Sequence, residues 1–150
     1  MKSISKILET AKSVIQLESE AIAQLGQQLS DDFEKAVELI LSSDGRVIVA
    51  GVGKSANIAS KIVATFNSTG QPAIFLHAAD AIHGDLGNIQ KNDVVICISK
   101  SGNTEEIKYL LPLIKNMGNQ IIAICGNKDS YLADQTHLFL NASVKKEACP

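Results

Sequence analysis

The sequence has no tryptophan, few other aromatic residues and a single arginine. Aromatic residues make up 4% of the 150 residues, and of the 14 basic residues all but Arg46 are lysine. Proteins that read nucleic acids usually carry an arginine-rich basic face, and single-strand binders stack bases on aromatic side chains. Because the formal net charge is also −2, we expect no nucleic-acid partner.

Cysteine is scarce, and no apolar run is long. Cys97, Cys125 and Cys149 have no metal-binding or redox spacing, and three scattered cysteines fit a reducing compartment better than a disulfide scaffold. Cys97 and Cys125 lie in apolar runs, so we expect them to be buried as small hydrophobic side chains. No run approaches the roughly 20 apolar residues of a transmembrane helix, and residues 1–16 lack the apolar core of a signal peptide. We therefore expect a cytoplasmic protein with no membrane partner.

Length and composition favour one globular domain over residues 1–150. Hydrophobic residues make up 45% of the chain and charged residues 20%, as in soluble globular proteins. A chain of this length buries about two-thirds of its unfolded surface, so it needs neither a disulfide nor a metal ion to hold a core.

The first third of the chain predicts two amphipathic helices. Apolar residues recur at spacings of three and four from Ile4 to Leu29, with Gly26 as a point where this long helix could break. Ser30 is placed to cap a second helix over residues 31–42, and Gly45 is expected to end it as a C-terminal cap.

The rest of the chain alternates predicted strands and helices. Short apolar runs without alternation, typical of strands buried on both faces, lie at 46–50, 73–76, 94–98, 120–125 and, more weakly, 137–140. Helical patterns lie between them at 55–69 and 104–117, the second containing Pro112 and ending at Gly118. This alternation predicts an α/β fold: a three-layer αβα sandwich of flavodoxin or Rossmann type with about five parallel strands.

Ligands of such folds bind beyond the carboxyl ends of the strands. The loop after the first strand runs Gly-Val-Gly-Lys-Ser from Gly51. Its glycines allow the backbone to approach a ligand closely. Lys54 adds a positive charge where a helix begins, which favours an anion. It is not a Walker A loop, because Ile48 stands where the first glycine is needed. Gly51, Gly53 and Ala56 match a dinucleotide fingerprint, but no acidic residue closes the second strand, so dinucleotide binding is the weaker alternative.

The loop after the third strand, Ser99–Thr104, is called the serine loop below. Its three hydroxyls, on Ser99, Ser101 and Thr104, can donate to phosphate oxygens next to a helix start. Thr104 could instead cap that helix, but capping accounts for only one of the three hydroxyls. Since hydroxyls rather than arginines are present, we expect a single phosphomonoester as ligand.

Two further charged stretches are ambiguous when their residues are taken alone. The loop after the second strand holds His77, Asp80, His83 and Asp85, but its two histidines are six residues apart, which matches neither a helical pair nor zinc-finger spacing. Each histidine could be a ligand or an ordinary hydrogen-bonded group. The stretch at residues 145–147 has the composition of a solvated surface.

Four segments together resemble the SIS (sugar isomerase) domain of arabinose-5-phosphate isomerases. They are Gly51–Ser55 (GVGKS), His83–Gly87 (HGDLG), Ser99–Gly102 (SKSG) and Lys146–Pro150 (KEACP). The serine-glycine segment is moderately specific, whereas HGDLG and KEACP in one chain are much more so. The family interconverts D-arabinose 5-phosphate and D-ribulose 5-phosphate for the synthesis of Kdo in lipopolysaccharide or capsule. The resemblance, which runs from about Lys6 to the last residue, implies this activity, a phosphorylated sugar as partner, and a homo-oligomer (dimer or tetramer).

The resemblance also assigns roles to individual residues. It implies active-site functions for Lys54, Glu106 and Glu147, substrate contact for His83, and a zinc ion, not required for turnover, at His77. We expect phosphate or substrate contacts from the two glycine-containing loops: Gly53, Ser55, Ser99, Ser101, Gly102, Asn103 and Thr104. Glu147 is the first candidate for the proton-transferring base and Glu106 the second. No nicotinamide cofactor is expected, since the isomerisation involves no net redox change.

The chain departs from the family at its end. Family members continue beyond the segment that ends here at Pro150, with a further active-site histidine and usually a pair of CBS domains, so we expect a C-terminally truncated SIS domain without a CBS pair. A non-catalytic phosphosugar sensor is the alternative function. Such a sensor would need the serine loop to bind the phosphate, but it would not need Lys54, Glu106 and Glu147. All three are present, which favours an enzyme. An isomerase of another phosphosugar is a further alternative.

Overall fold

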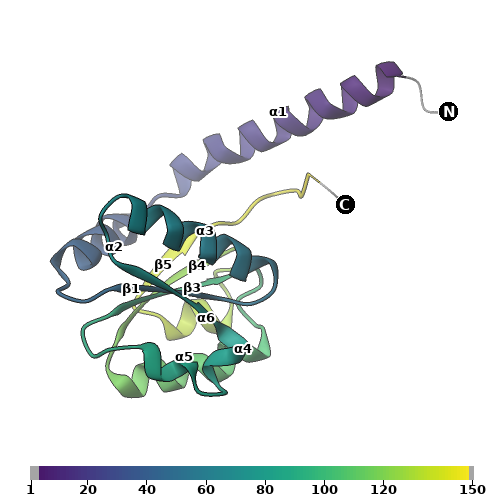
Figure 1. Cartoon of the computed structure of the whole chain (residues 1–150). Helices are drawn as coiled ribbons and strands as arrows, with labels where there is room; N and C mark the ends of the chain where they lie inside the picture. The colour runs from purple at the N-terminus through teal and green to yellow at the C-terminus, as the bar shows by residue number, and fades with distance from the viewer. Residues whose placement is uncertain (1–3, 149–150) are drawn as a thin grey trace. The chain divides into compact units, whose positions relative to one another are not determined.

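All five predicted strands are present and pair in parallel in the order β2-β1-β3-β4-β5 (Figure 1). The computed structural model describes residues 4–148. The strands are β1 (Val47–Gly51), β2 (Ala73–His77), β3 (Val94–Ser99), β4 (Gln120–Cys125) and β5 (Leu138–Asn141). The two central strands, β1 and β3, are buried along their whole length, which explains their unbroken apolar sequence.

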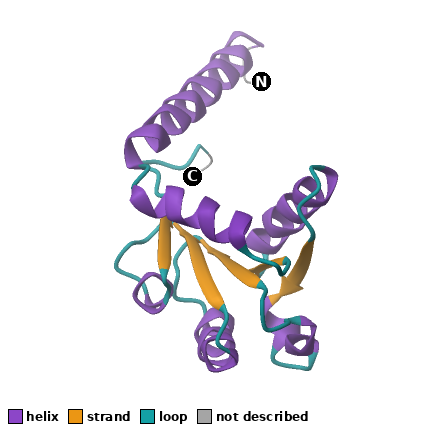
Figure 2. Ribbon diagram, turned by 90° about the vertical axis from the view of Figure 1, so that its left-hand side faces the viewer, coloured by secondary structure: helices purple, strands orange, loops and turns teal. Residues whose placement is uncertain are grey.

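Helices cover both faces of the sheet, as Figure 2 shows, so the predicted three-layer sandwich is confirmed. On one face lie α2 (Asp31–Ser42) and α3 (Lys54–Ser68), and on the other α4 (Ala78–Ala81), α5 (Glu105–Met117) and α6 (Tyr131–Gln135), with the short 3-10 helix η1 (Asp85–Asn88) between β2 and β3. The sequence did not predict α4, η1 or α6, because four or five residues are too few to show a helical period.

The described chain divides into two compact units. One is Ser30–Ser143, which contains the sheet, and the other comprises α1 (Ile4–Gln28) and the chain from Val144 onward. α1 continues through Gly26 without a break, and Ile7, Leu8, Ile15 and Ile22 on it are exposed. Within residues 4–148, no helix combines the length and the apolar character needed to cross a membrane.

The helix-end predictions were partly wrong. Gly45 does not cap α2, which ends at Ser42 with Ser43 as its C-cap. Instead, a Cβ on Gly45 would lie 2.1 Å from the carbonyl oxygen of Asn92, so glycine is required there for close backbone approach. Ser30 occupies the N-cap position of α2, but its side chain makes no capping hydrogen bond. Gly118 does end α5 in the left-handed conformation, with φ 82°, and α5 contains Pro112.

Cys97 and Cys125 are both buried, as predicted. Burial raises the pKa of the Cys97 thiol to about 12, so this side chain is a neutral, packed thiol in the middle of the sheet. Cys149 lies outside the described residues.

A partly buried ion pair joins the amino ends of β1 and β3. The Arg46 guanidinium donates to Asp93 through Nη2 at 2.7 Å and through Nε at 3.2 Å. The backbone N–H groups of Arg46 and Gln90 donate to the same carboxylate. Burial alone would raise the pKa of Asp93, but these hydrogen bonds outweigh it, so that pKa lies below its ordinary value of 3.8. Asn119 extends the network, since its Nδ2 donates to the carbonyls of Gln90 and Asp93.

Candidate functional site

The strand order places a topological switch point at the carboxyl ends of β1 and β3. The chain leaves β1 to form β2 on one side, whereas β3 leads to β4 on the other, so the order reverses between these two neighbouring strands. Ligands of open α/β sheets bind at such a switch point. The structure therefore brings together two of the loops predicted to form the site, the one that follows Gly51 and the serine loop. His77, at the end of β2, pairs with Gly51 on the other side of β1.

The loop after β1 turns sharply into α3. Gly53 has φ 58° and ψ −126°, a conformation that residues other than glycine rarely adopt. A Cβ on Gly51 would lie 2.9 Å from the carbonyl of Ser55, so the first turn of α3 packs directly on the strand end. Lys54 is exposed, and the first turn of α3 contains no acidic residue. The positive end of the helix dipole and the lysine together favour an anion at this position.

The serine loop presents hydroxyl groups at the start of α5. Ser99 is 4% exposed, and its Oγ accepts a hydrogen bond from Gly102 N–H at 3.0 Å. Ser101 Oγ accepts one from Asn103 N–H at 3.3 Å, which leaves both hydroxyl protons for donation. Thr104 occupies the N-cap position of α5, but its side chain does not cap the helix. Its Oγ1 is buried and, among the described residues, has no hydrogen-bond partner.

That unpartnered hydroxyl is the strongest sign of a ligand at this edge of the sheet. Leaving a buried hydroxyl unpaired costs about 1–3 kcal/mol, so buried polar groups in native proteins nearly always have a partner. Thr104 Oγ1 has almost no accessible surface, so its side chain must rotate before a phosphate oxygen next to the amino end of α5 supplies the acceptor that it lacks.

Two predicted contact residues of the serine loop have a structural role. Asn103 Oδ1 accepts a hydrogen bond from Tyr131 N–H at 2.9 Å, and its Nδ2 donates to the carbonyl of Ser101 at 3.3 Å. Gly102 is buried with φ 69°, and its carbonyl accepts from Leu132 N–H. Both residues therefore hold the serine loop in place through hydrogen bonds to the first residues of α6.

The remaining predicted site residues of this unit follow the same strands. Glu106 is the second residue of α5 and is half-buried. His83 is exposed between α4 and η1, and its backbone N–H bonds the carbonyl of Asp80. Ser55 lies half-buried in the first turn of α3. A base, a cation and an imidazole thus follow three adjacent strands, beside the hydroxyls of the serine loop.

Comparison with known proteins identifies the family. Residues 40–149 match the family model of the SIS domain. This chain belongs to the SIS-domain family. The predicted resemblance is confirmed. The chain is 49% identical over 143 residues to the arabinose 5-phosphate isomerase KdsD of Pseudomonas aeruginosa and 46% identical over 151 residues to that of Francisella tularensis.

These alignments cover 95% and 99% of this chain but only 44% and 46% of the two relatives, so the chain spans less than half of their length. Among solved structures, an Escherichia coli protein in complex with arabinose 5-phosphate superposes with a TM-score of 0.92 at 39% identity. That match covers 97% of this chain and 78% of the other. It confirms the predicted α/β fold.

The described residues do not form a zinc site at His77. Its Nδ1 is buried without a hydrogen-bond partner and lies 3.6 Å from Asp80 Oδ2. Zinc in proteins is usually held by three or four His, Cys, Asp or Glu ligands. Residues 4–148 contain no cluster of three or more such side chains.

The KEACP segment belongs to the compact unit that contains α1. Glu147 is exposed there, in irregular backbone after β5, and Cys149 and Pro150 lie outside the described residues. The composition of residues 145–147 alone indicates only a solvated surface. The family resemblance is therefore what marks Glu147 as a candidate base. Sequence reasoning also missed the loop after β4. Its Ser130, with Cys125 at the end of β4, lies against Gly102. A glycine, an asparagine and a serine soon after a predicted strand were the available signal.

Proposed function

We propose that this chain is an aldose–ketose isomerase that interconverts D-arabinose 5-phosphate and D-ribulose 5-phosphate. The observation that carries the proposal is the serine loop, with the unpartnered Thr104 hydroxyl at the start of α5. The names of the relatives and the arabinose 5-phosphate bound to the E. coli neighbour support the same substrate. We also propose that the reaction takes place in the cytoplasm and that its product supplies Kdo synthesis for lipopolysaccharide or capsule.

The first requirement of the reaction is a fixed sugar. The hydroxyls of Ser99, Ser101 and Thr104 bind the phosphate together with the helix start at Ser55. Holding the phosphate in one place sets the distance from C1 and C2 to the groups that act on them, which makes proton transfer effectively intramolecular.

The second requirement is proton transfer between C1 and C2. A carboxylate, Glu147 or Glu106, removes the proton from C2 of the aldose while a proton is delivered to O1, giving an enediol. The O2 proton then leaves as C1 receives a proton, and the ketose results. Lys54 and His83 stabilise the negative charge that develops on O1 and O2. Hydrogen and electrons balance within the sugar, so we propose that no nicotinamide takes part and that a zinc ion at His77 is not required for turnover.

Proton exchange tests this proposal directly. The chain is incubated with D-ribulose 5-phosphate in D₂O, and NMR follows deuterium uptake at C1 and the appearance of arabinose 5-phosphate. Exchange with product formation supports the isomerase. Binding without exchange favours the alternative, a phosphosugar-sensing domain. If a folded sample neither binds nor exchanges, the substrate assignment is wrong, and other phosphosugars become the next candidates.

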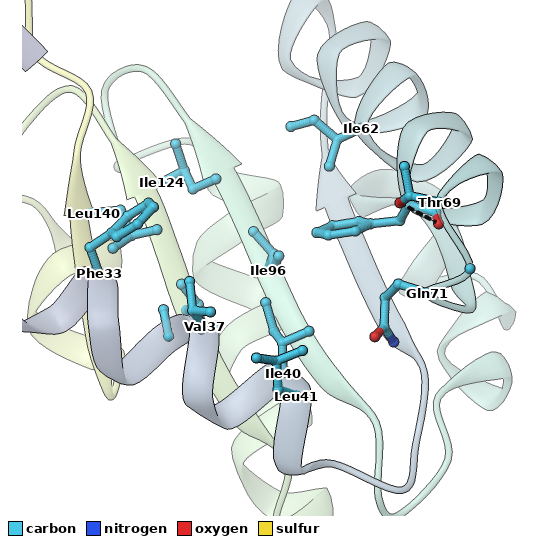
Figure 3. A pocket seen from close by; sticks show the side chains of 14 residues that line it. Phe33, Val37, Ile40, Leu41, Ile62, Thr69, Gln71, Ile96, Ile124 and Leu140 are labelled. Carbon is cyan, nitrogen blue, oxygen red and sulfur yellow. Dashed lines mark hydrogen bonds between the residues drawn. The ribbon is translucent and has the colours of Figure 1, made fainter.

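We propose in addition that the chain assembles as a homo-oligomer, a dimer or a tetramer. α1 exposes several large apolar side chains. Separately, a cavity of about 610 Å³ lies between α2 and α3 over the sheet, lined almost entirely by apolar side chains (Figure 3). Leu41 at its rim is 76% exposed, and none of the loops that form the candidate active site line the cavity. Exposed apolar side chains gathered at one place on a surface commonly mark interfaces.

Light scattering on the chain tests the assembly. We expect the wild type to elute as a dimer or larger and Leu41→Gln to shift towards the monomer, while Glu38→Gln, on the same helix, leaves the mass unchanged. A monomeric wild type at micromolar concentration contradicts the proposal.

A further inference from the structure

The loop between β4 and α6 lies directly against the serine loop. Lys100 O accepts a hydrogen bond from Gly126 N–H at 3.2 Å, and Gly102 O accepts one from Leu132 N–H at 3.0 Å. The Asn103 side chain accepts a third from Tyr131 N–H at 2.9 Å. Three successive parts of the serine loop are therefore tied to one neighbouring loop, residues 126–132, which the reaction scheme above does not use.

Ser130 is at the centre of this contact. It is 3% exposed, and its Oγ donates to Asn127 O at 2.7 Å and accepts from Ala133 N–H at 3.3 Å, which caps α6. Cys125 Sγ lies 3.6 Å from the same hydroxyl. The hydroxyl is thus fully engaged inside its own loop and has no hydrogen left to give to a substrate.

Gly102 rests on the surface that Ser130 forms. A Cβ on Gly102 would lie 2.2 Å from Ser130 Oγ, 2.5 Å from Ser130 Cβ and 2.8 Å from Cys125 Sγ. The contact is reciprocal, because a Cβ on Gly126 would lie 2.9 Å from the carbonyl oxygen of Lys100. Each loop therefore contributes one glycine at which the other loop approaches as closely as backbone allows.

We propose that Ser130 is a positioning residue for the phosphate site. By holding residues 127–130 in one conformation, its hydroxyl fixes the surface beneath Gly102 and so the direction in which Ser101 and Thr104 present their hydroxyls. Ser130 itself does not contact the sugar. The inference rests on the proposed function, since it assumes that the serine loop binds the phosphate. Preorganised donors bind an anion more tightly than mobile ones, because less ordering is needed on binding.

A double-mutant cycle tests the inference. Affinities for arabinose 5-phosphate and for inorganic phosphate are measured by calorimetry for wild type, Ser130→Ala, Thr104→Val and the double variant. We expect Ser130→Ala and Thr104→Val each to weaken both ligands about tenfold. Both changes act on one loop. The fold-loss of affinity in the double variant should therefore be smaller than the product of the fold-losses in the two single variants. Ser68→Ala, an exposed serine at the end of α3, should change neither affinity.

The outcomes separate this inference from the proposed function. If wild type binds neither ligand, the proposed function fails. If wild type binds and Ser130→Ala binds equally well, or if the two changes multiply independently, the positioning role is wrong while the function stands. Should Ser130→Ala not fold, Ser130→Cys keeps a side chain of similar shape with a weaker donor. We then expect a loss of about threefold, and unchanged affinity in that variant likewise overturns the inference.

Discussion

The two ends of the sheet differ in how their buried polar groups are paired. At the amino end, the carboxylate of Asp93 accepts four hydrogen bonds, three from Arg46 and one from Gln90, although Asn119 Oδ1 in the same network has no hydrogen-bond partner among the described residues. At the carboxyl end, Thr104 Oγ1 and His77 Nδ1 are buried without a hydrogen-bond partner among the described residues. An unpaired buried group costs stability. The Asp93 network thus holds the sheet together, whereas the Thr104 hydroxyl lies at the start of α5, where a bound phosphate would accept from it.

The largest expected effect comes from breaking the amino end. Asp93→Ala leaves the partly exposed Arg46 guanidinium and two backbone N–H groups without their acceptor, and the loss of these hydrogen bonds should cost about 3 kcal/mol. Urea unfolding at pH 7 measures this, with Asp44→Ala as control, because Asp44 is a carboxylate outside this network, beside the same strand. We expect the control to change the free energy of unfolding by less than about 0.5 kcal/mol. A similar loss in both variants would contradict the role given to Asp93.

The second-largest expected loss of stability comes from a substitution at the carboxyl end of the sheet. Gly102→Ala places a Cβ against Ser130 at a φ of 69°. Backbone strain and overpacking together should lower the free energy of unfolding by about 2 kcal/mol or more and abolish phosphosugar binding.

Gly26→Ala in α1 is the control, since a Cβ there meets no atom within 4 Å, its φ is not positive, and it lies outside the segments that mark the candidate site. Unfolding and calorimetric titration of both variants provide the measurement. Unimpaired binding by Gly102→Ala would show that the serine loop does not form the phosphate site.

Acid should weaken the amino end selectively. The pKa of Asp93 in the folded chain lies below its ordinary value of 3.8, so its contribution to stability is complete above that pH and is lost as the pH falls through the folded-state value. We therefore expect the difference in unfolding free energy between wild type and Asp93→Asn to be constant from pH 7 to about 5 and to shrink below 3.8. Urea unfolding across this range measures it. A difference that stays constant at the lowest pH would mean that the carboxylate's charge is not what stabilises this end.

The strands and the two long helices of the sandwich could be predicted because their signals are local. A strand such as β3 is an apolar run that needs no knowledge of its neighbours, and α5 is marked by its apolar period and by Gly118. Gly45 and Ser130 could not be interpreted in this way, because their roles depend on Asn92 and Gly102, which lie far away in the sequence. Glu147 has no distinctive local pattern either, and only the resemblance to relatives marks it.

The smallest expected change in stability has the opposite sign. Thr104→Val keeps the shape of the side chain and removes the hydroxyl that has no partner among the described residues, so the free energy of unfolding without ligand should rise by about 1 kcal/mol. The affinity for arabinose 5-phosphate should fall about tenfold in the same variant, because the hydroxyl no longer donates to the phosphate. Thermal unfolding with and without ligand measures both effects, and Thr10→Val, on the exposed face of α1, is the control. A variant that is less stable and binds normally would show that Thr104 serves the fold, and the contrast between the two ends of the sheet would then not hold.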